Sequence, residues 1–379
     1  MSATTSPDPA APPQAGDAGA DRLSLASQRQ LVWLKFRRHR LALVSLAVLG
    51  VLYLLAIFAD FFAPYPKNYR IPDAQFSSPT RIRVFDPATG FTAPFVYAAR
   101  KELDEATYTY RTVPDRSRRI PVRFFSSGAP YKVLGLIPAQ TRLFGVGEGY
   151  LALFGTNNIG MDVYSQTLYA GRISLSVGLV GVLISFVLGV TLGGISGYFG
   201  GFVDDAIQRL IEFILSLPQL PLWIALSAAI PNNWSGIETF FAITIILSFI
   251  GWTGLARVVR GRLISMREDD YVMAAKVAGS TDRKVIVSHL LPGFLSYLVV
   301  SITLAIPHMI LGETTLSFLG LGILPPEVSW GSMMQQARSL IVIFNYPWHL
   351  IPTIFIVTAV LAFNFIGDGL RDAADPYSR

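Results

Sequence analysis

Six long apolar segments alternate with polar stretches along this chain, and each has about the 20 residues that a helix needs to cross a bilayer. The predicted spans cover residues 41–62, 173–196, 207–230, 237–256, 294–318 and 348–366. The third contains Glu212, Pro218 and Pro221, so we expect a kinked helix that neighbouring protein partly shields from lipid. The pattern therefore predicts an all-α polytopic membrane protein with six transmembrane helices.

Basic residues beside the spans indicate which ends lie in the cytosol. The first span is preceded by Lys35, Arg37, Arg38 and Arg40. The loop after the fourth span carries Arg257, Arg260, Arg262, Arg267, Lys276, Arg283 and Lys284. Cytosolic loops are enriched in Lys and Arg, and six crossings return the chain to its starting side. Both indicators predict that the N- and C-termini are cytosolic.

The same pattern divides the chain into four parts. Residues 1–30 are rich in Ala, Pro, Ser, Asp and Gly, a composition typical of a disordered cytosolic tail. Residues 31–63 combine an amphipathic lead-in with the first span, and residues 64–171 form an extracytoplasmic insert. Residues 172–379 hold the remaining five spans as a helical core.

The insert is expected to contain β-strands and one helix. Runs of β-branched and aromatic residues at 81–85, 108–113 and 120–125 are bounded by Pro, Gly or Asp, which predicts short strands. Residues 155–171 are expected to form a helix along the membrane surface, marked by Asp162, Tyr164 and Gln166.

The composition supports a membrane protein and excludes several kinds of site. Of the 379 residues, 52% are hydrophobic and only 15% are charged, against about 25% charged residues in soluble domains. In a membrane protein, a net charge of +6 indicates basic anchoring of the cytosolic side before it indicates nucleic-acid binding. The chain has no cysteine, and its four histidines are scattered and show no metal-ligand spacing.

A polar interruption before the fifth span is the main candidate for a functional segment. Residues 271–279 predict a short helix with a face of small residues, and Gly279 is placed to end it in the left-handed conformation. Such a helix suits docking into a groove on a soluble partner, which makes 257–292 a candidate coupling loop. An ordinary basic cytosolic loop is the alternative. The candidate coupling residues are Ala274, Ala275, Gly279, Leu291 and Pro292, the last two at the break before the fifth span.

Four further residues could act in translocation. Glu313 is a lone acid within a predicted span, where acids often mark functional sites. A proton relay would need a second acid in mid-span, which the sequence lacks, so we favour packing or helix linking for Glu313. Pro307, His308 and Trp330 could line or gate a path, although a proline kink with a packed histidine explains the first two equally well.

Several motifs resemble one transporter family. The run Met273-Ala-Ala-x-x-x-Gly279, followed by Pro292, resembles the EAA coupling loop of ATP-binding cassette (ABC) importer permeases. Other motifs resemble the second membrane subunit of the dipeptide/oligopeptide permease family: Phe36-x-x-x-Arg40-Leu-Ala-Leu, Phe154-Gly-Thr-Asn-Asn-x-Gly-x-Asp162, Gly171-Arg-Ile-Ser-Leu, Gly197-Tyr-Phe-Gly-Gly, Gly251-Trp-Thr-Gly-x-Ala-Arg257, Glu313-Thr-Thr-Leu-Ser-Phe-Leu-Gly-Leu-Gly322, Pro325-Pro-x-x-Ser-Trp-Gly331 and Gly367-Asp-x-Leu-Arg-Asp372. Each motif is loose alone, but their number and order are specific.

The resemblance implies an importer permease fold in a bacterial inner membrane, with a five-helix core after the first span. It implies a homologous second permease, two cytosolic ATPase subunits and an external solute-binding protein as partners, besides membrane lipid. Ala274, Ala275 and Gly279 would dock on an ATPase. ATP and Mg would bind to those partners, which agrees with the lack of a Gly-x4-Gly-Lys-Ser/Thr loop here. The chain would be a non-catalytic subunit that forms half of a path for di- or oligopeptides.

Three positions depart from the family pattern. Met273 stands where the family usually has Glu, Asn157 where it has Asp, and Met161 where it has Arg. Docking should therefore rest on the surface of Ala274 and Ala275 and on the break at Gly279 rather than on an ion pair.

Two alternative functions stay open. The same machinery could carry another solute, such as an oligosaccharide, an opine or a nickel complex. A proton-coupled carrier acting alone is a different class of protein, and copurification of ATPase subunits would exclude it.

Overall fold

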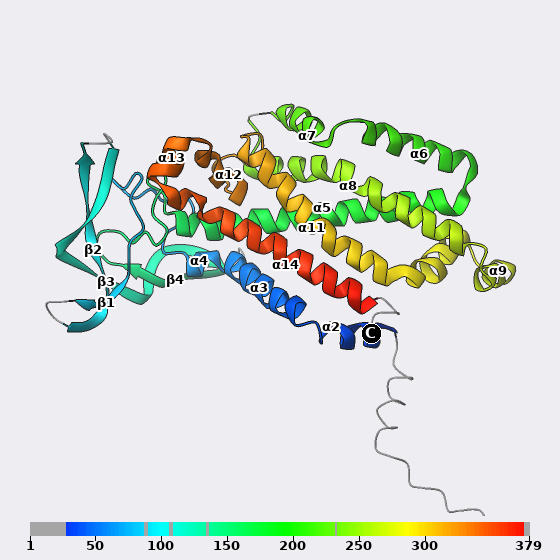
Figure 1. Cartoon of the computed structure of the whole chain (residues 1–379), viewed down its shortest axis with the longest axis horizontal. Helices are drawn as coiled ribbons and strands as arrows, with labels where there is room; N and C mark the ends of the chain where they lie inside the picture. The colour runs from blue at the N-terminus through cyan, green and yellow to red at the C-terminus, as the bar shows by residue number, and fades with distance from the viewer. Residues whose placement is uncertain (1–27, 87–89, 106–108, 134–135, 232, 375–379) are drawn as a thin grey trace, which may run out of the picture.

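A bundle of long helices carries a β-sheet at one end (Figure 1). The computed structural model describes residues 28–374, apart from short gaps at 87–89, 106–108, 134–135 and 232. Nearly all of the predicted tail, residues 1–30, lies outside the described residues.

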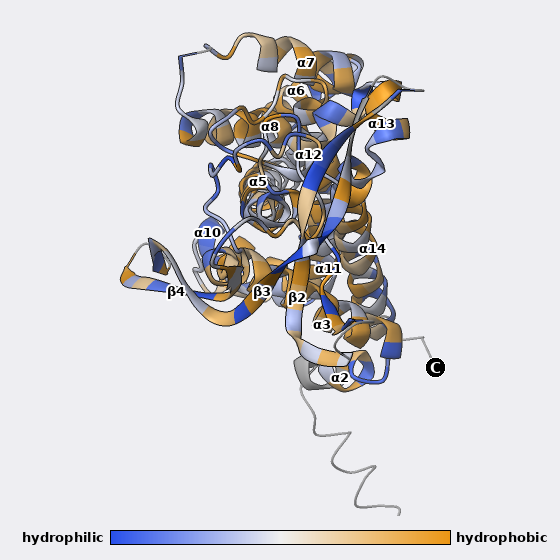
Figure 2. Ribbon diagram, turned by 90° about the vertical axis from the view of Figure 1, so that its left-hand side faces the viewer, coloured by the Kyte–Doolittle hydropathy of each residue, from blue (hydrophilic) through white to orange (hydrophobic). Residues whose placement is uncertain are grey.

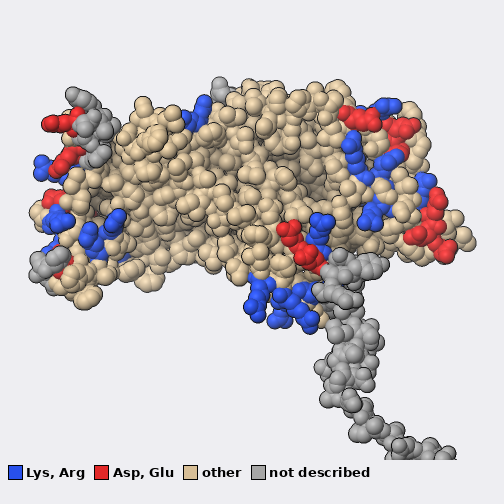
Figure 3. Space-filling model, in the orientation of Figure 1, with Lys and Arg blue, Asp and Glu red and all other residues tan. Residues whose placement is uncertain are grey.

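The long helices coincide with the apolar segments of the sequence. They are α3 (Arg40–Ile57), α5 (Val163–Phe199), α8 (Gly236–Met266), α11 (Leu295–Phe318) and α14 (Ile351–Ala374). In the described part of the chain, five helical stretches are long and apolar enough to cross a membrane, or six if one bent pair counts as a span. Charged side chains gather over the strands and toward the opposite end, with a largely uncharged belt between them (Figure 3). The prediction of a multi-pass membrane protein is confirmed.

The predicted third span is broken into two helices. α6 (Gly201–Ser216) and α7 (Gln219–Ala228) meet at 85°. Pro218 disfavours helical backbone at the residue before it, and Leu217 is accordingly extended, with ψ of 133°. Each helix alone is shorter than the roughly 20 residues of a full span. The expected kink is therefore a complete break.

Between α4 (Ala59–Phe62) and α5, the chain forms an antiparallel sheet with strand order β1-β2-β3-β4. The strands are β1 (Arg83–Asp86), β2 (Gly90–Asp104), β3 (Thr109–Val133) and β4 (Ile137–Val146). Seen end-on, the strands lie across the ends of the helices, and the ribbon of β3 and β4 projects to one side (Figure 2). A β-containing insert is thus present, but the strands predicted at 108–113 and 120–125 are parts of one long strand, β3, and β2 and β4 were not predicted.

α5 is one continuous helix, so the separate surface helix expected at 155–171 is absent from the structure. It begins after Asp162, whose carboxylate accepts a hydrogen bond from the Ser165 N–H at 2.8 Å, and continues unbroken to Phe199. Its 37 residues give a length of about 55 Å, well beyond a hydrocarbon core of about 30 Å. Gln166 is buried rather than turned to the surface. The helix therefore extends past the membrane at its ends.

Glycines bring α5 and α8 into close contact. A Cβ on Gly193 would lie 2.8 Å from the Cα of Ala256, and one on Gly197 would lie 2.9 Å from the Cα of Arg260. Backbones approach this closely only where the side chain is a hydrogen atom. The close contact ends before Gly201, which lies beyond the turn in α6 and has open space around it.

Short elements complete both ends of the bundle. Near the N-terminus lies α2 (Gln28–Phe36), and between α8 and α11 lie α9 (Asp270–Val277), α10 (Asp282–Lys284), the π-helix η1 (Val285–Leu290) and the 3-10 helix η2 (Leu291–Phe294). Between α11 and α14 lie α12 (Trp330–Met334), η3 (Gln335–Arg338), α13 (Leu340–Asn345) and η4 (Pro347–Leu350).

Candidate functional site

α9 lies at the end of the bundle opposite the sheet (Figure 1). Its Val272 is fully buried in a small apolar core with Leu263, Val285 and Leu290. Met273 and Val277, four residues apart, are 49% and 87% exposed. Residues at this spacing are neighbours on a helix surface, so α9 presents a compact apolar face while Val272 holds it in place. Ala274 is also exposed, and Ala275 is half-buried.

Gly279 ends α9 through its backbone conformation. Its φ is +79°, in the left-handed region that was expected of it and that glycine adopts at little cost. The Ser280 N–H donates to the Ala275 carbonyl at 3.0 Å, and the Gly279 N–H donates to the Lys276 carbonyl at 2.9 Å. These two bonds form a Schellman motif. Because a Cβ here would meet no atom within 4 Å, the position requires glycine for its dihedral angles rather than for space.

Tyr198, at the end of α5, connects the two short helices on either side of Gly279. Its hydroxyl donates to Oδ1 of Asp282 at 2.5 Å. The Nζ atom of Lys276 lies 5.0 Å from the centroid of its ring, within range of a cation–π interaction. Sequence reasoning missed this residue, and its only signal was a place in the Gly197-Tyr-Phe-Gly-Gly motif.

Leu291 and Pro292 do not end the helical path. They lie in η2, which continues η1 directly into α11. Proline fits the first turn of a helix because N–H groups there have no partner within the helix, so the missing N–H of proline breaks no hydrogen bond. The expected break is therefore a change of helix type. Pro292 is exposed and Leu291 is half-buried, on the segment after η1 rather than on α9 itself.

An ion pair fixes the neighbouring ends of α6 and α8. The guanidinium group of Arg260 donates to both carboxylate oxygens of Asp204, and Ser196 on α5 also donates to this carboxylate. Paired bonds of this kind set orientation as well as distance. Arg260, counted in the sequence as one of the cytosolic basic residues, thus also joins three helices.

Glu313 is fully buried in a polar cluster between helices. The Ser174 hydroxyl on α5 donates to Oε2 at 3.2 Å, and the Ser317 hydroxyl on α11 donates to Oε1 at 2.6 Å. The Ser174 hydroxyl in turn accepts a hydrogen bond from the backbone N–H of Trp330 at 3.0 Å. The cluster therefore joins α5, α11 and α12 and can hold the acid without a cation.

Trp330, Pro307 and His308 have different surroundings. Trp330 is 2% exposed, and its indole N–H donates to the Thr167 carbonyl at 2.9 Å. Pro307 is buried within α11, whereas His308 beside it is exposed. Of the four residues suggested for translocation, the structure brings together Glu313 and Trp330 and leaves only His308 on the surface.

The loop before α5 uses an amide where an acid was expected. Asn157 Oδ1 accepts hydrogen bonds from the N–H groups of Ile159 and Met161, at 3.0 and 2.9 Å. A cleft of about 500 Å³ lies beside this loop. Its polar lining includes Asn68, Arg70, Asn157, Gln166, Glu327, Gln335 and Gln336. The cleft offers mainly amide groups, which can both donate and accept hydrogen bonds.

Among the residues that the structure describes, no group of three or more His, Asp or Glu side chains is arranged to hold a metal ion.

Comparisons with known proteins agree with these features. A family model described as "Binding-protein-dependent transport system inner membrane component" matches residues 189–379, and one described as "N-terminal TM domain of oligopeptide transport permease C" matches residues 27–79. The dipeptide transport system permease protein DppC of Bacillus subtilis is 40% identical over 227 residues, which cover 60% of this chain and 69% of that protein.

Two further relatives extend the match. The oligopeptide transport system permease protein OppC of Haemophilus influenzae is 41% identical over 61% of this chain and 72% of its own length. DppC of Lactococcus lactis subsp. cremoris is 32% identical over 351 residues, 92% of this chain and 90% of that protein. The resemblance that the motifs indicated is confirmed, and the chain belongs to the family of inner-membrane components of binding-protein-dependent transport systems.

Proposed function

We propose that this chain is a permease subunit of an ATP-driven importer and forms half of a path for di- or oligopeptides. The observation that carries the proposal is α9, whose exposed apolar face is fixed by buried Val272 and by the left-handed end at Gly279. The peptide cargo is supported by relatives named as permease proteins of dipeptide and oligopeptide transport systems.

α9 docks on a cytosolic ATPase partner in this proposal. The exposed pair Met273 and Val277 enters an apolar groove, so the contact needs no acid at position 273. The other partners are a homologous second permease, a second ATPase and an external solute-binding protein. ATP and Mg bind to the ATPases, and this chain itself performs no catalysis. Both termini lie in the cytosol, on the same side as α9.

Movement of the docked ATPase reaches the spans through contacts on both sides of α9. Val272 packs against Leu263 of α8, and Lys276 packs on the Tyr198 ring at the end of α5. Tyr198 also bonds to Asp282, just after Gly279. Displacing α9 therefore displaces α5 and α8 together.

The outer cleft beside Asn157 is the proposed entrance for cargo. Its amide side chains can pair with the N–H and carbonyl groups that every peptide carries, whatever its sequence. Such contacts suit varied peptides, with the choice of cargo left to the external binding protein.

Replacing Gly279 tests the coupling role. Gly279→Val places a β-branched residue in the left-handed region, which costs roughly 1–2 kcal/mol or more, and should distort the end of α9. In proteoliposomes with all partners, we expect ATP hydrolysis to continue while uptake falls. Gly279→Asn is the matched control, because Asn tolerates this conformation, and it should retain coupled uptake. Full coupled uptake by the Val variant would refute docking through α9.

The same proteoliposomes test the cargo. We expect the ligands eluted from the cognate binding protein to be peptides. The same peptides should be taken up when the loaded binding protein is added to the outside of the proteoliposomes. An oligosaccharide, opine or nickel complex in their place would overturn the peptide assignment alone. Loss of uptake on collapse of the proton gradient, with ATP held constant, would overturn the ATP-driven mechanism.

A further inference from the structure

α3 is the most exposed of the candidate spans. Only 22% of the residues in its apolar stretch are buried within the chain, against 39–50% of those in the apolar stretches of the other four. Its exposed residues include Val44, Val51 and Phe58 at its end, spaced by seven and therefore close to one face of the helix. Because α3 lies at the edge of the bundle, packed on α5 and α14 (Figure 1), this apolar face is left uncovered by the rest of the described chain, as a lipid-facing surface would be.

The lipid-facing stripe continues from α3 onto the sheet. Phe61 follows Phe58 by one helical turn, and its ring centroid lies 6.4 Å from that of Phe125 on β3. Phe125 and the adjacent Phe124 are 67% and 59% exposed. We call Phe58, Phe61, Phe124 and Phe125 the outer aromatic ridge. Its members form an apolar surface that leads from the first span to the insert.

The backbone at Phe125 is strained. Its φ is +52°, a value that is unusual for a bulky residue and persists only when the surrounding structure enforces it. Within the described chain the ring remains mostly exposed, so burial in this chain gives little compensation. A contact between this ring and something outside the chain would compensate the strain.

Arginines fix the ridge at the depth of the outer end of α3. Arg142 on β4 is 2% exposed, and its Nη1 atom donates to the Ala63 carbonyl at 2.7 Å and to the Asp60 carbonyl at 3.1 Å. Arg172 on α5 donates from Nε to the Ala56 carbonyl at 2.7 Å. The strands that carry Phe125 are thus attached directly to the end of the first span and cannot lie far from the membrane surface.

We propose that the outer aromatic ridge enters the outer-leaflet interface and anchors the insert to phospholipid. The occupant follows from continuity, because the ridge extends the exposed apolar face of a helix that is long and apolar enough to cross the bilayer. Aromatic side chains beside the ends of spans commonly lie at headgroup depth. Arg123, exposed next to Phe124, can reach lipid phosphates from the same strand. The anchor holds the sheet against the bilayer next to the first span.

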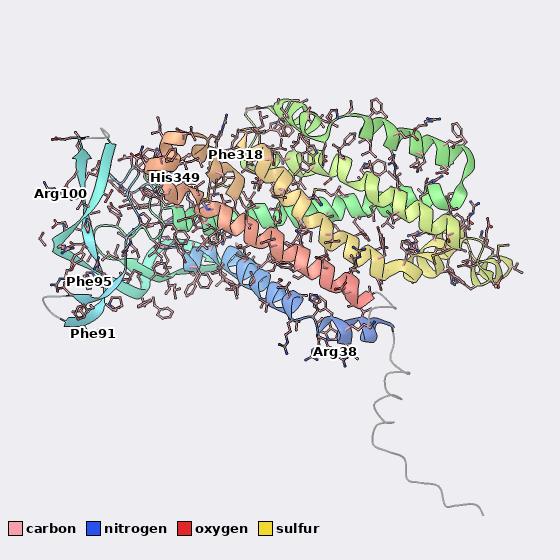
Figure 4. The ribbon with its side chains drawn as sticks, in the orientation of Figure 1. Arg38, Phe91, Phe95, Arg100, Phe318 and His349 are labelled. Atoms are coloured by element: carbon pink, nitrogen blue, oxygen red, sulfur yellow. The ribbon has the colours of Figure 1, made fainter. Side chains whose placement is uncertain are left out.

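Spin labels can measure this depth, because the chain has no native cysteine. Phe125→Cys and, separately, Phe124→Cys are labelled with a nitroxide in the full chain, purified in its native complex in phosphatidylethanolamine/phosphatidylglycerol nanodiscs. Collision rates with oxygen, which enters lipid, are compared with those of a water-soluble nickel chelate. Leu54→Cys on α3 gives the lipid reference, and Arg100→Cys, on the sheet away from the bundle (Figure 4), gives the water reference.

We expect the oxygen-to-nickel ratio at positions 124 and 125 to be several-fold higher than at 100 and to approach that at 54. Phe124→Cys retains the native residue at the strained position, so it keeps the test decisive if the other variant misfolds. Nickel collisions as frequent as at 100 would show a water-facing ridge and overturn the proposal. Low rates with both reagents would show a protein contact, with the binding protein or the second permease, and would overturn it too.

Discussion

Asp162 is buried where it caps α5, only 2% exposed. Burial raises the pKa of its carboxyl to about 7, and hydrogen bonds from Ser165, which lower the pKa, offset this only in part. The loop before α5 therefore holds an acid that changes its charge near neutral pH, close to the cleft beside Asn157.

This pKa predicts a pH-dependent stability. In the unfolded chain the carboxyl has a pKa near 4, so the folded state holds the proton more tightly. The stabilisation is complete below about pH 4 and is lost as the pH rises through about 7, by roughly 4 kcal/mol in free energy of unfolding. Asp162→Asn keeps the oxygen that accepts the Ser165 N–H but cannot ionise. We expect the thermal midpoint in nanodiscs to fall between about pH 5 and pH 8 for the native chain and to change less in the variant. Parallel curves for the two proteins would contradict the prediction.

Single residues differ in how far the sequence could predict them. The conformation of Gly279 was predictable because helix termination depends on a few adjacent residues. Tyr198 was not, because its partner Asp282 is 84 positions away and the contact exists only after α5 and α10 meet. Glu313 was recognisable as an acid in an apolar segment, but its serine partners come from two helices.

Among the elements, the contact between α5 and α8 gives opposite predictions for two glycines. Gly193→Ala forces a methyl group against the backbone of Ala256, and overpacking of this kind costs about 1–3 kcal/mol. Gly261 on α8 has open space, so Gly261→Ala should instead stabilise the helix by about 0.5–1 kcal/mol. Thermal unfolding in nanodiscs should show a lower midpoint for the first variant and an equal or higher one for the second. Equal losses in both would mean that the two backbones do not approach as described.

The lengths of the apolar segments predicted the long helices well. A segment that crosses lipid must satisfy its backbone hydrogen bonds within itself, and a helix does so. The apolar lengths predicted less where polar ends extend a helix, as in α5, which starts ten residues before the predicted span at 173. The strands were harder still. β2 reads Gly-Phe-Thr-Ala-Pro-Phe-Val-Tyr-Ala-Ala-Arg-Lys-Glu-Leu-Asp, where proline and a charged run hide the alternation that normally marks a strand.

At the scale of the whole molecule, Arg142 holds the insert on the bundle. Arg142→Gln removes the guanidinium group that binds the carbonyls of Asp60 and Ala63, and leaving buried carbonyls unpaired costs about 1–3 kcal/mol. We expect faster cleavage of the insert by an added protease, while the helices stay protected by the nanodisc.

Arg118→Gln is the control for this change. Arg118 pairs with Glu148 at 2.8 Å, but both side chains are largely exposed, and surface pairs contribute at most about 1 kcal/mol. Its cleavage rate should match that of the native protein. If the Arg142 variant is cleaved no faster, other contacts are sufficient to hold the insert.

Sequence reasoning predicted the insert but not its attachment to the bundle. The attachment depends on Arg142, which a strand pattern treats as one more polar residue, and on carbonyls of α4 far away in the sequence. The exposed face of α9 was easier to anticipate, since its residues are contiguous.

The unbroken length of α5 has a mechanical consequence. The helix carries Tyr198 at one end and begins beside Asp162 and the cleft near Asn157 at the other. Close contacts with α8 run along it from Gly189 through Gly193 to Gly197, so the two helices form one stiff strut. A displacement at the Tyr198 end would therefore be carried to the cleft by the length of a single helix, without a separate signal between the two ends of the bundle.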